Sequence, residues 1–254
     1  MVSGVGPARL AALTAACGSP SAVLERSAAE LHSIPGIGEA LAAKIASWRE
    51  HIDLAAELDL AERGGVRILV QADPEYPSIL KEIHDAPICL YVRGTLPDLD
   101  SASIAIVGSR RMTAYGRTMA KHLSESAVYA GWTVVSGLAY GIDAIAHQAA
   151  LDAGGKTIAV LGGGLARVQP QDHLPLAREI AQSGAVVSEY PMEFPPNRRS
   201  FPMRNRIISG LSRATLVVEA GIGSGALITA AAAIEQGRSV FSVPGGSDKI
   251  PQAA

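Results

Sequence analysis

The stretch Ile104-Ala-Ile-Val-Gly-Ser-Arg110 pairs a short apolar strand with a turn of glycine and serine, and the rest of the chain repeats this plan. The predicted strands are Ile104–Val107, Thr133–Ser136, Thr157–Leu161, Ala185–Ser188, Thr215–Glu219 and Val240–Val243. The predicted helices are Ala114–Ala130, Gly141–Ala153, Leu174–Gln182, Arg204–Leu211 and Ser224–Gln236. Near-continuous apolar strands that alternate with amphipathic helices predict a parallel sheet with helices on both faces. Because crossovers are right-handed, residues 103–254 are predicted to form an α/β domain with a Rossmann-like, doubly wound, mostly parallel sheet.

The first sixty residues have the pattern of short helices, with apolar residues at helical spacing. A weak internal repeat occurs there: Gly4-Val5-Gly6 returns as Gly36-Ile37-Gly38, each time before a predicted helix. The second copy resembles a helix-hairpin-helix turn, whose glycines aim backbone N–H groups at a phosphate. A structural turn in a protein-contact module is an equal alternative. Residues 1–60 are therefore predicted to be a small all-α, SAM-like or helix-hairpin-helix domain, followed by a connector over 61–102 with short strands.

Composition limits the class of protein. With 254 residues, of which 48% are hydrophobic and 18% charged, the chain can form one or two folded domains. Its two cysteines, Cys17 and Cys89, fit neither a disulfide framework nor a metal site. No apolar run is long enough for a membrane helix and no secretory signal is visible, which predicts a cytoplasmic protein.

The net charge of −2 conceals an uneven distribution. Residues 1–103 carry 8 Lys and Arg against 14 Asp and Glu, whereas residues 104–245 carry 13 against 9. Eleven of those 13 cations are arginine, whose planar guanidinium suits phosphate oxygens. Five arginines between Glu193 and Glu219 have no acid among them: Arg198, Arg199, Arg204, Arg206 and Arg213. Charge alone nevertheless favours an ordinary solvated basic face.

In a doubly wound sheet, ligands bind beyond the carboxyl ends of the strands. The turns at these ends are 108–111, 136–143, 162–164, 188–190 and 221–225, and they are rich in glycine and serine. Glycine lets the backbone approach an anion, and the helix that follows presents unpaired N–H groups. The turns therefore predict a row of phosphate-sized anion sites along one edge of the sheet.

Motifs of common nucleotide-dependent and hydrolytic enzymes are absent from the sequence. It contains no G-x-x-x-x-G-K-[ST] loop, no G-x-S-x-G elbow and no H-E-x-x-H, and its first strand does not end in G-x-G-x-x-G. Asp143 and His147 stand four residues apart on a predicted helix, but as an acid–base pair they lack a nucleophile. We favour structural roles for both, and we predict no catalytic residue, metal or cofactor.

Taken together, the turn sequences resemble one known family. Ile104–Arg110 and Val134-Val-Ser-Gly-Leu-Ala-Tyr-Gly-Ile-Asp143, with His147, are similar to the DNA-processing protein A family, also called DprA or Smf. The other matching motifs are Phe201-Pro-Met-Arg-Asn-Arg-Ile-Ile-Ser-Gly-Leu211, Ser224-Gly-Ala-Leu-Ile-Thr-Ala230, and Glu235-Gln-Gly-Arg238 with Val243-Pro-Gly245. The helical N-terminal part also fits the SAM-like domain of that family.

The resemblance implies a single-stranded DNA-binding protein of natural transformation, not an enzyme. Such proteins protect incoming strands, help to load the recombinase RecA and form homodimers through the Rossmann-like domain. On this chain, the implied phosphate-binding residues are Gly108, Ser109, Arg110, Ser136, Gly137, Gly141, Asp143, Arg204, Asn205, Arg206, Ser224 and Gly225. For Arg204 and Arg206, an ion pair with Glu189 or Glu219 is the alternative.

The sequence also departs from the family pattern. Tyr140 and Gly223 stand where the family often has a basic residue, which predicts weaker phosphate binding, although Tyr140 can stack on a base. The family segment that follows Val243-Pro-Gly245, and the winged-helix domain of many members, are not in this sequence. Two other functions stay open. One is a nucleotide-sensing module, and the other is a phosphoribohydrolase of the LOG type, although the first acid after Gly221 is Glu235 and not an adjacent glutamate.

Overall fold

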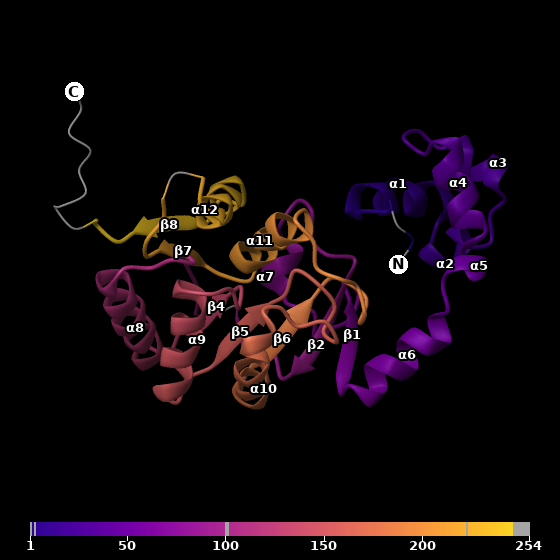
Figure 1. The fold of residues 1–254 in the computed structure, drawn as a ribbon. Coiled ribbons are helices and arrows are strands. Elements are labelled where there is room, and N and C mark those ends of the chain that lie inside the picture. The colour runs from indigo at the N-terminus through magenta and orange to yellow at the C-terminus, as the bar shows by residue number, and fades with distance from the viewer. Residues whose placement is uncertain (1, 3, 100–101, 222, 246–254) are drawn as a thin grey trace, which may run out of the picture. The chain divides into compact units, whose positions relative to one another are not determined.

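The computed structural model describes residues 2, 4–99, 102–221 and 223–245. It divides the chain into two compact units, Met1–Arg63 and Gly64–Ala254. Figure 1 follows the chain through both of them, and each unit has its own cluster of buried apolar side chains.

The first unit is built from helices. They are α1 (Pro7–Cys17), α2 (Pro20–Val23), α3 (Ala28–His32), α4 (Glu39–Ala46), α5 (Trp48–His51) and α6 (Leu54–Arg63). Ser27 begins α3 with a capping box, because its hydroxyl accepts from the N–H of Glu30 while the Glu30 carboxylate accepts from the N–H of Ser27. The helices bury Leu13, Leu31 and Ile45 in a common core.

The internal repeat of the first unit has a structural counterpart. Gly4 and Gly36 have positive φ angles of 98° and 84°, a backbone conformation that favours glycine. Two residues later, Gly6 and Gly38 are the N-caps of α1 and α4. Each Gly-x-Gly therefore turns the chain and starts a helix, as the predicted hairpin requires.

The second unit is built on one sheet. Its strands are β1 (Val66–Val70), β2 (Cys89–Gly94), β3 (Ser103–Val107), β4 (Thr133–Ser136), β5 (Thr157–Val160), β6 (Ala185–Ser188), β7 (Ala214–Val217) and β8 (Ser239–Ser242), in the order β1-β2-β6-β5-β4-β3-β7-β8. Neighbours from β6 to β8 are parallel, so the predicted Rossmann-like, mostly parallel sheet is confirmed. Residues 61–102, which the sequence predicts to be a connector with short strands, contain β1 and β2, and these strands extend the sheet: β2 pairs antiparallel with β6 and β1 with β2. They thereby cover an edge that β6 would otherwise leave open.

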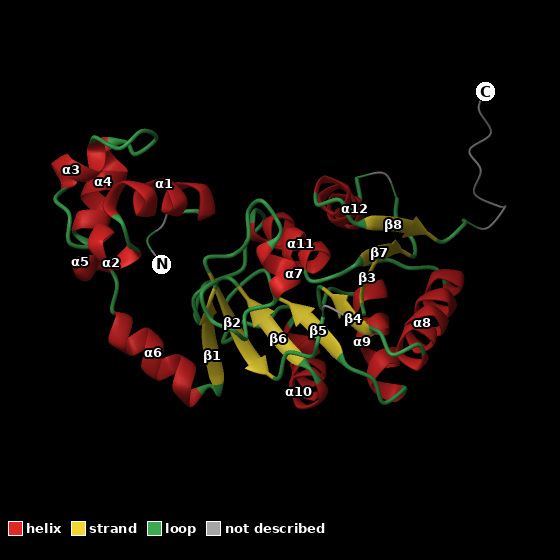
Figure 2. Cartoon of the chain, turned by 180° about the vertical axis from the view of Figure 1, so that it is seen from behind, coloured by secondary structure: helices red, strands yellow, loops and turns green. Residues whose placement is uncertain are grey.

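Helices cover both faces of the sheet, as Figures 1 and 2 show. One layer contains α8 (Ala114–Tyr129), α9 (Ile142–Asp152) and α10 (Leu174–Ser183), and the other contains α7 (Ser78–Lys81), α11 (Ser200–Gly210) and α12 (Gly225–Glu235). The side chains of β3 alternate between the layers: Ala105 and Val107 pack with α11, whereas Ile104 and Ile106 pack with α8 and α9. Because both faces are buried, the strand is apolar along most of its length.

The order of the strands reverses at β3, which lies between β4 and β7. From β3 the chain builds outward through β4, β5 and β6, and it then crosses back to place β7 and β8 on the other side of β3. Helices on opposite faces follow β3 and β7, so the turns after these two strands separate. A crevice at such a switch point is the usual ligand site of a doubly wound sheet.

Candidate functional site

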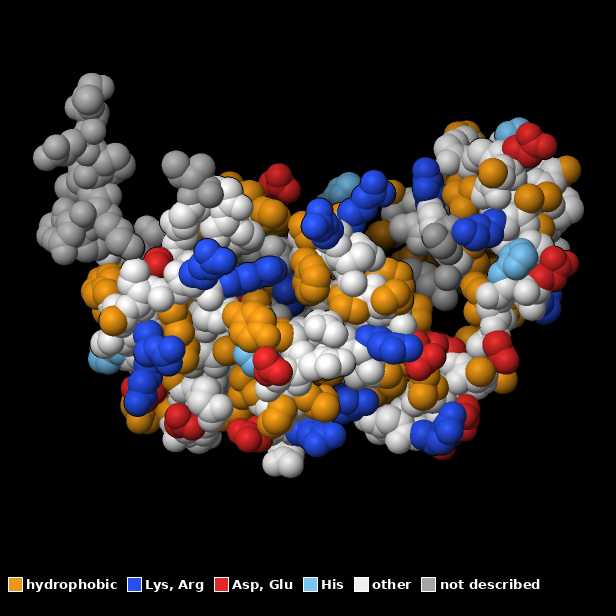
Figure 3. All heavy atoms as spheres, in the orientation of Figure 1, with side chains coloured by type: hydrophobic (Ala, Val, Ile, Leu, Met, Phe, Trp, Pro, Cys, Tyr) orange, Lys and Arg blue, Asp and Glu red, His pale blue; other side chains and the backbone are white. Residues whose placement is uncertain are grey.

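A cleft of about 670 Å³ opens at the switch point between β3 and β7. The predicted site residues that line it are Gly108, Ser109, Arg110, Asp143, Arg204, Asn205, Ser224 and Gly225. The structure thus brings together residues from the turn after β3, the start of α12 and the inner face of α11, which lie far apart in the sequence. Figure 3 shows Lys and Arg side chains beside α11 on the face of the molecule that it draws.

The turn after β3 is held by main-chain bonds on two sides. The N–H of Ser109 donates to the carbonyl of Glu219 beyond β7 at 2.6 Å, and its carbonyl accepts from the N–H of Ile142 at the start of α9 at 3.2 Å. Gly141 has a φ of 79°, and a Cβ there would collide with the Ser109 carbonyl and with Arg110. The predicted glycine is therefore required for this close contact, although Gly141 does not line the cleft.

The start of α12 forms the opposite wall. Ser224 caps the helix by accepting from the N–H of Ala226, so the positive end of the helix dipole lies at the cleft. The side-chain amide of Asn205 donates to the carbonyl of Gly225 at 3.1 Å. Asn205 thereby ties α11 to this wall, and the arrangement favours an anion between the two turns.

The N–H groups of the turn after β4 are hydrogen-bonded by a side chain of the protein itself. The carboxylate of Asp143 accepts from the N–H groups of Gly137 at 3.2 Å and Ala139 at 3.4 Å. The hydroxyl of Ser136 donates to the carbonyl of Ile106 and is fully buried. The Asp143 carboxylate therefore accepts from two N–H groups of the turn that the sequence assigns to a phosphate, and phosphate binding by Ser136, Gly137 and Asp143 stays a prediction.

Arg204 lies beneath this turn and is only 4% exposed. Its Nη1 donates to the carbonyl of Gly137 at 2.7 Å and to that of Val160, so it joins the ends of β4 and β5. Burial raises the pKa of Asp143, which the charge of Arg204 opposes, and burial lowers the pKa of Arg204 to about 10, which the charge of Asp143 opposes. The predicted phosphate fork is therefore, in this structure, an internal brace.

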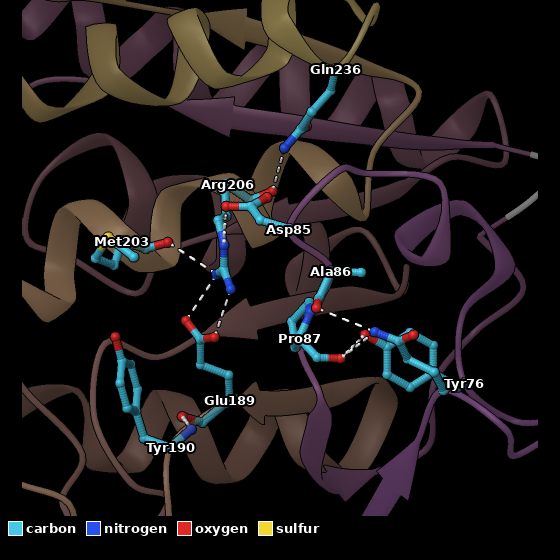
Figure 4. A network of polar contacts seen from close by, with 11 residues as sticks. Tyr76, Asp85, Ala86, Pro87, Glu189, Tyr190, Met203, Arg206 and Gln236 are labelled. Carbon is cyan, nitrogen blue, oxygen red and sulfur yellow. Dashed lines mark hydrogen bonds and ion pairs between the residues drawn. The ribbon is translucent and has the colours of Figure 1, made fainter. Parts of the chain in front are cut away.

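Arg206 faces a different region, which Figure 4 shows. Its Nη1 and Nη2 donate to the two oxygens of Glu189 at 2.9 and 2.7 Å, and its Nε lies 2.8 Å from Asp85. Burial lowers the pKa of Arg206, but Glu189 and Asp85 outweigh burial and raise it. With its guanidinium occupied by two carboxylates, Arg206 adopts the alternative ion pair with Glu189 and does not line the cleft.

The turns after β5 and β6 are also used inside the protein. The hydroxyl of Ser188 donates to the carbonyl of Gly163 at 2.8 Å, and the N–H of Gly164 donates to the carbonyl of Phe194. These glycines are buried. These glycines do not line the cleft, which forms where the two turns at the switch point diverge, and the predicted row of anion sites stays a prediction.

Tyr140 and His147 have separate surroundings. The ring of Tyr140 is 48% exposed, and its hydroxyl donates to Asp172 at 3.1 Å. His147 is buried, with Nδ1 2.7 Å from the hydroxyl of Thr157, and burial lowers its pKa to about 3. It therefore stays neutral at pH 7, and its ring contacts the hydroxyl of Thr157, which agrees with a structural role.

Arg111, Arg198 and Phe201 are charged or aromatic residues of the cleft that the predicted phosphate-binding set does not include. Arg110 lies over the ring of Phe201, with 5.9 Å between its Cζ and the ring centroid. Arg110, Arg111 and Arg198 are exposed, and none of them forms an ion pair within the described residues. The signals were present, since Arg198 begins the acid-free run of arginines and the chain has only three Phe.

Two features are absent from the part of the chain that the structure describes. No group of three or more His, Cys, Asp and Glu side chains is placed to hold a metal ion. No helix there has both the length and the apolar character needed to cross a membrane.

The fold and the cleft define an α/β protein with an arginine-lined cleft at a Rossmann-like switch point, preceded by a helical unit with two glycine hairpins. The family model described as DNA recombination-mediator protein A matches residues 67–253, and the model described as SAM-like helix-hairpin-helix tandem matches residues 1–47. The chain belongs to the DNA recombination-mediator protein A family.

Relatives agree with this assignment. DNA processing protein DprA of Bacillus subtilis is 44% identical over 182 residues, which are 71% of this chain and 61% of that protein. Protein Smf of Escherichia coli is 49% identical over 179 residues, which are 70% of this chain and 48% of that protein. This chain therefore spans about half to three-fifths of the length of these curated relatives.

Solved structures show the same fold. The X-ray structure of DNA processing protein A from Streptococcus pneumoniae matches 82% of this chain and 72% of its own, with a TM-score of 0.74 and 39% identity. The structure concerned with the single-stranded DNA binding mode of DNA processing protein A from Helicobacter pylori matches 72% of this chain and 82% of its own, with a TM-score of 0.66 and 30% identity.

Proposed function

We propose that the second unit binds single-stranded DNA in the cleft between β3 and β7, and that the protein acts in natural transformation by protecting incoming strands and helping to load RecA. The observation that carries the proposal is the cleft itself. Three exposed arginines, Arg110, Arg111 and Arg198, have no carboxylate partner within the described residues, and they surround a helix N-terminus. The acid in the lining, Asp143, is buried and already accepts two N–H bonds. The single-stranded DNA binding mode of the Helicobacter pylori relative supports the same ligand.

The chemistry of the cleft fits a DNA backbone. Guanidinium groups form paired hydrogen bonds with phosphate oxygens, and the Ser109 hydroxyl is positioned at the same wall. The ring of Tyr140 is 48% exposed and available to a base, and the half-buried ring of Phe201 lies in the lining beneath Arg110. Contacts of this kind recognise phosphates and base faces, so we expect little sequence preference.

The proposal is tested by fluorescence anisotropy of a labelled oligo-dT with the wild-type chain, Arg110→Ala and Arg198→Ala at 50 and 200 mM salt. Lys156→Ala is the control. Lys156 is exposed and directly precedes β5, so it lies at the amino ends of the parallel strands, whereas the cleft lies at their carboxyl ends. We expect each cleft variant to bind more weakly and to reduce the salt slope by about 0.7, the contribution of one phosphate contact on a single strand. Wild-type affinity in both cleft variants contradicts the proposal.

The two alternative functions, a nucleotide sensor and a phosphoribohydrolase, predict different results. A nucleotide sensor would bind dTMP more tightly than oligo-dT. A phosphoribohydrolase would release a base, but the first acid after the start of α12, Glu235, ends that helix ten residues later, about 15 Å from Gly225. This distance leaves the glycine turn without an adjacent carboxylate on α12, so hydrolysis has no support from the geometry.

We also propose that the second unit forms a homodimer. The outer face of α12 exposes Leu227 and Ile234 by 45 and 67%, and Phe241 on β8, the last strand of the sheet, is 56% exposed. An apolar helix face beside an open strand edge is suited to a second copy of the same surface. Sedimentation of Ile234→Glu should give a monomer if this face is the interface, and an unchanged dimer would place the interface elsewhere.

A further inference from the structure

A second cavity of the same unit carries positive charge that the proposed DNA cleft does not use. It has a volume of about 1180 Å³ and lies beside α10. Arg93 of β2, Arg167 and Arg178 of α10 line it, and Glu193 is the acid in its lining. Figure 3 shows a group of Lys and Arg side chains near α10, separate from the group beside α11.

Two of these arginines are not neutralised by an acid. Arg93 donates from Nε to the carbonyl of Gly64 at 3.0 Å and from Nη1 to that of Leu165 at 3.5 Å, both of which are uncharged acceptors. Within the described residues neither Arg93 nor Arg178 forms an ion pair. Burial lowers the pKa of Arg93, and the nearby charge of Arg178 lowers it further. Two like charges in a half-buried wall repel each other, and an anion between them would relieve that repulsion.

The charge of the third arginine, Arg167, is neutralised only in part. Arg167 lies 3.7 Å from Glu193, and both side chains are more than half exposed, so this pair contributes little. The cavity therefore holds an excess of cationic side chains over acidic ones.

The second cavity adjoins the cleft, because Phe201 lines both. A groove that follows a single strand combines cationic side chains for the phosphates with aromatic rings for the bases. Phe201 supplies such a ring between the arginines of the cleft and those of the second cavity.

We propose that the second cavity is a second phosphate-binding site, in which Arg93 and Arg178 hold the backbone of the same single strand after it passes Phe201. This inference rests on the proposed DNA binding in the cleft. It adds a path for the strand from the cleft to the second cavity. A short oligonucleotide should occupy the cleft alone, and a longer one should occupy both sites.

The experiment compares the wild-type chain with Arg178→Ala on labelled oligo-dT from about 4 to about 16 nucleotides, the range of site sizes of comparable single-strand binders. Arg178 is exposed on α10, so its replacement is compatible with folding. Lys156→Ala is again the matched control for the loss of one charge. Arg110→Ala is measured in parallel to report on the cleft.

We expect Arg178→Ala to bind the shortest oligonucleotides like the wild type and the longest ones more weakly. On the longest ones, the ratio of wild-type to Arg178→Ala affinity should fall about 2.6-fold between 50 and 200 mM salt, since one lost contact reduces the slope by about 0.7. Lys156→Ala should leave both lengths unchanged.

Three results would overturn the inference. Unchanged binding of Arg178→Ala at every length, with weakened binding of Arg110→Ala, would remove the second site and leave the cleft intact. An equal loss at all lengths would exclude sequential filling. A third result concerns dTMP as a competitor of oligo-dT. If dTMP competes with oligo-dT on the wild type but not on Arg178→Ala, and the effect of Arg178→Ala does not depend on oligonucleotide length, the cavity binds a free nucleotide. If instead Arg110→Ala binds normally, as Arg198→Ala also does, the proposed function itself fails.

Discussion

The replacement Arg204→Met tests whether the arginine inside the cleft braces the fold or contacts DNA. Methionine has a similar reach but no charge, so the carbonyls of Gly137 and Val160 lose a donor, and the buried carboxylate of Asp143 loses its nearby cation. Removing one partner of a buried charged pair typically costs about 3–5 kcal/mol. A buried carbonyl without a partner costs about 1–3 kcal/mol. Because these losses overlap, we expect the free energy of unfolding to fall by about 3–5 kcal/mol.

The assay must report on the second unit alone. The chain has two tryptophans, Trp48 in the first unit and Trp132 in the second. In a Trp48→Phe background, Trp132 fluorescence during urea denaturation measures the unfolding of the second unit. Arg204→Met and Asp143→Asn, made singly and together, complete a double-mutant cycle, in which we expect the double variant to lose less than the sum of the single losses.

The pH dependence gives a second readout with a defined sign. Burial raises the pKa of Asp143 in the folded state, so the folded protein binds more protons than the unfolded chain above the ordinary pKa of 3.8. Stability from this group therefore falls as pH rises between that value and the raised folded pKa. Without Arg204 the folded pKa of Asp143 rises further, so the stability lost by Arg204→Met should grow as the pH rises above 3.8.

DNA binding separates a brace from a contact. A brace that positions the turns lowers the affinity of the folded variant without changing the salt slope. A loss of stability below about 1 kcal/mol, additive with Asp143→Asn, would refute the brace. A salt slope reduced by about 0.7 would instead show that Arg204 meets a phosphate, as the sequence predicts.

Three further replacements have expected outcomes. Gly141→Ala forces a residue with a Cβ to adopt a φ of 79° against the Ser109 carbonyl, so thermal unfolding should show a loss of at least about 1–2 kcal/mol, and a wild-type melting temperature would contradict the contact. Arg206→Met leaves Glu189 buried without its partner and should cost about 3–5 kcal/mol in urea denaturation, while the salt slope of DNA binding stays unchanged. The pKa of His147 is lowered to about 3 in the folded state, so between this value and pH 6.5 the unfolded chain binds a proton at this residue and the folded protein does not. Stability should therefore fall with decreasing pH between 6.5 and about 3, by up to about 1.4 kcal/mol per pH unit, and His147→Gln should lose this dependence.

The fold followed from local patterns. Apolar strands with glycine turns recur at regular spacing, so the positions of β3 to β8 agree with the sequence to within about two residues. Gly4 and Gly36 signalled the two hairpins of the first unit in the same local way. The sequence also predicted the short strands of the connector but not their place in the sheet, because β2 pairs with β6 and β1 with β2 through long-range contacts that periodicity does not record.

The site was predicted less completely, for a physical reason. A turn of glycine, serine and arginine has the same sequence whether its polar groups contact a ligand or contact each other inside the protein. Local sequence therefore indicated anion-binding turns at every strand end, and Gly108, Ser109 and Arg110 do line a cleft. Only the tertiary structure decided that Asp143 fills the turn after β4, that Arg206 pairs with Glu189, and that the turns at the switch point alone separate into a cleft. These outcomes depend on which strands become neighbours, and that is set by packing across the whole sheet.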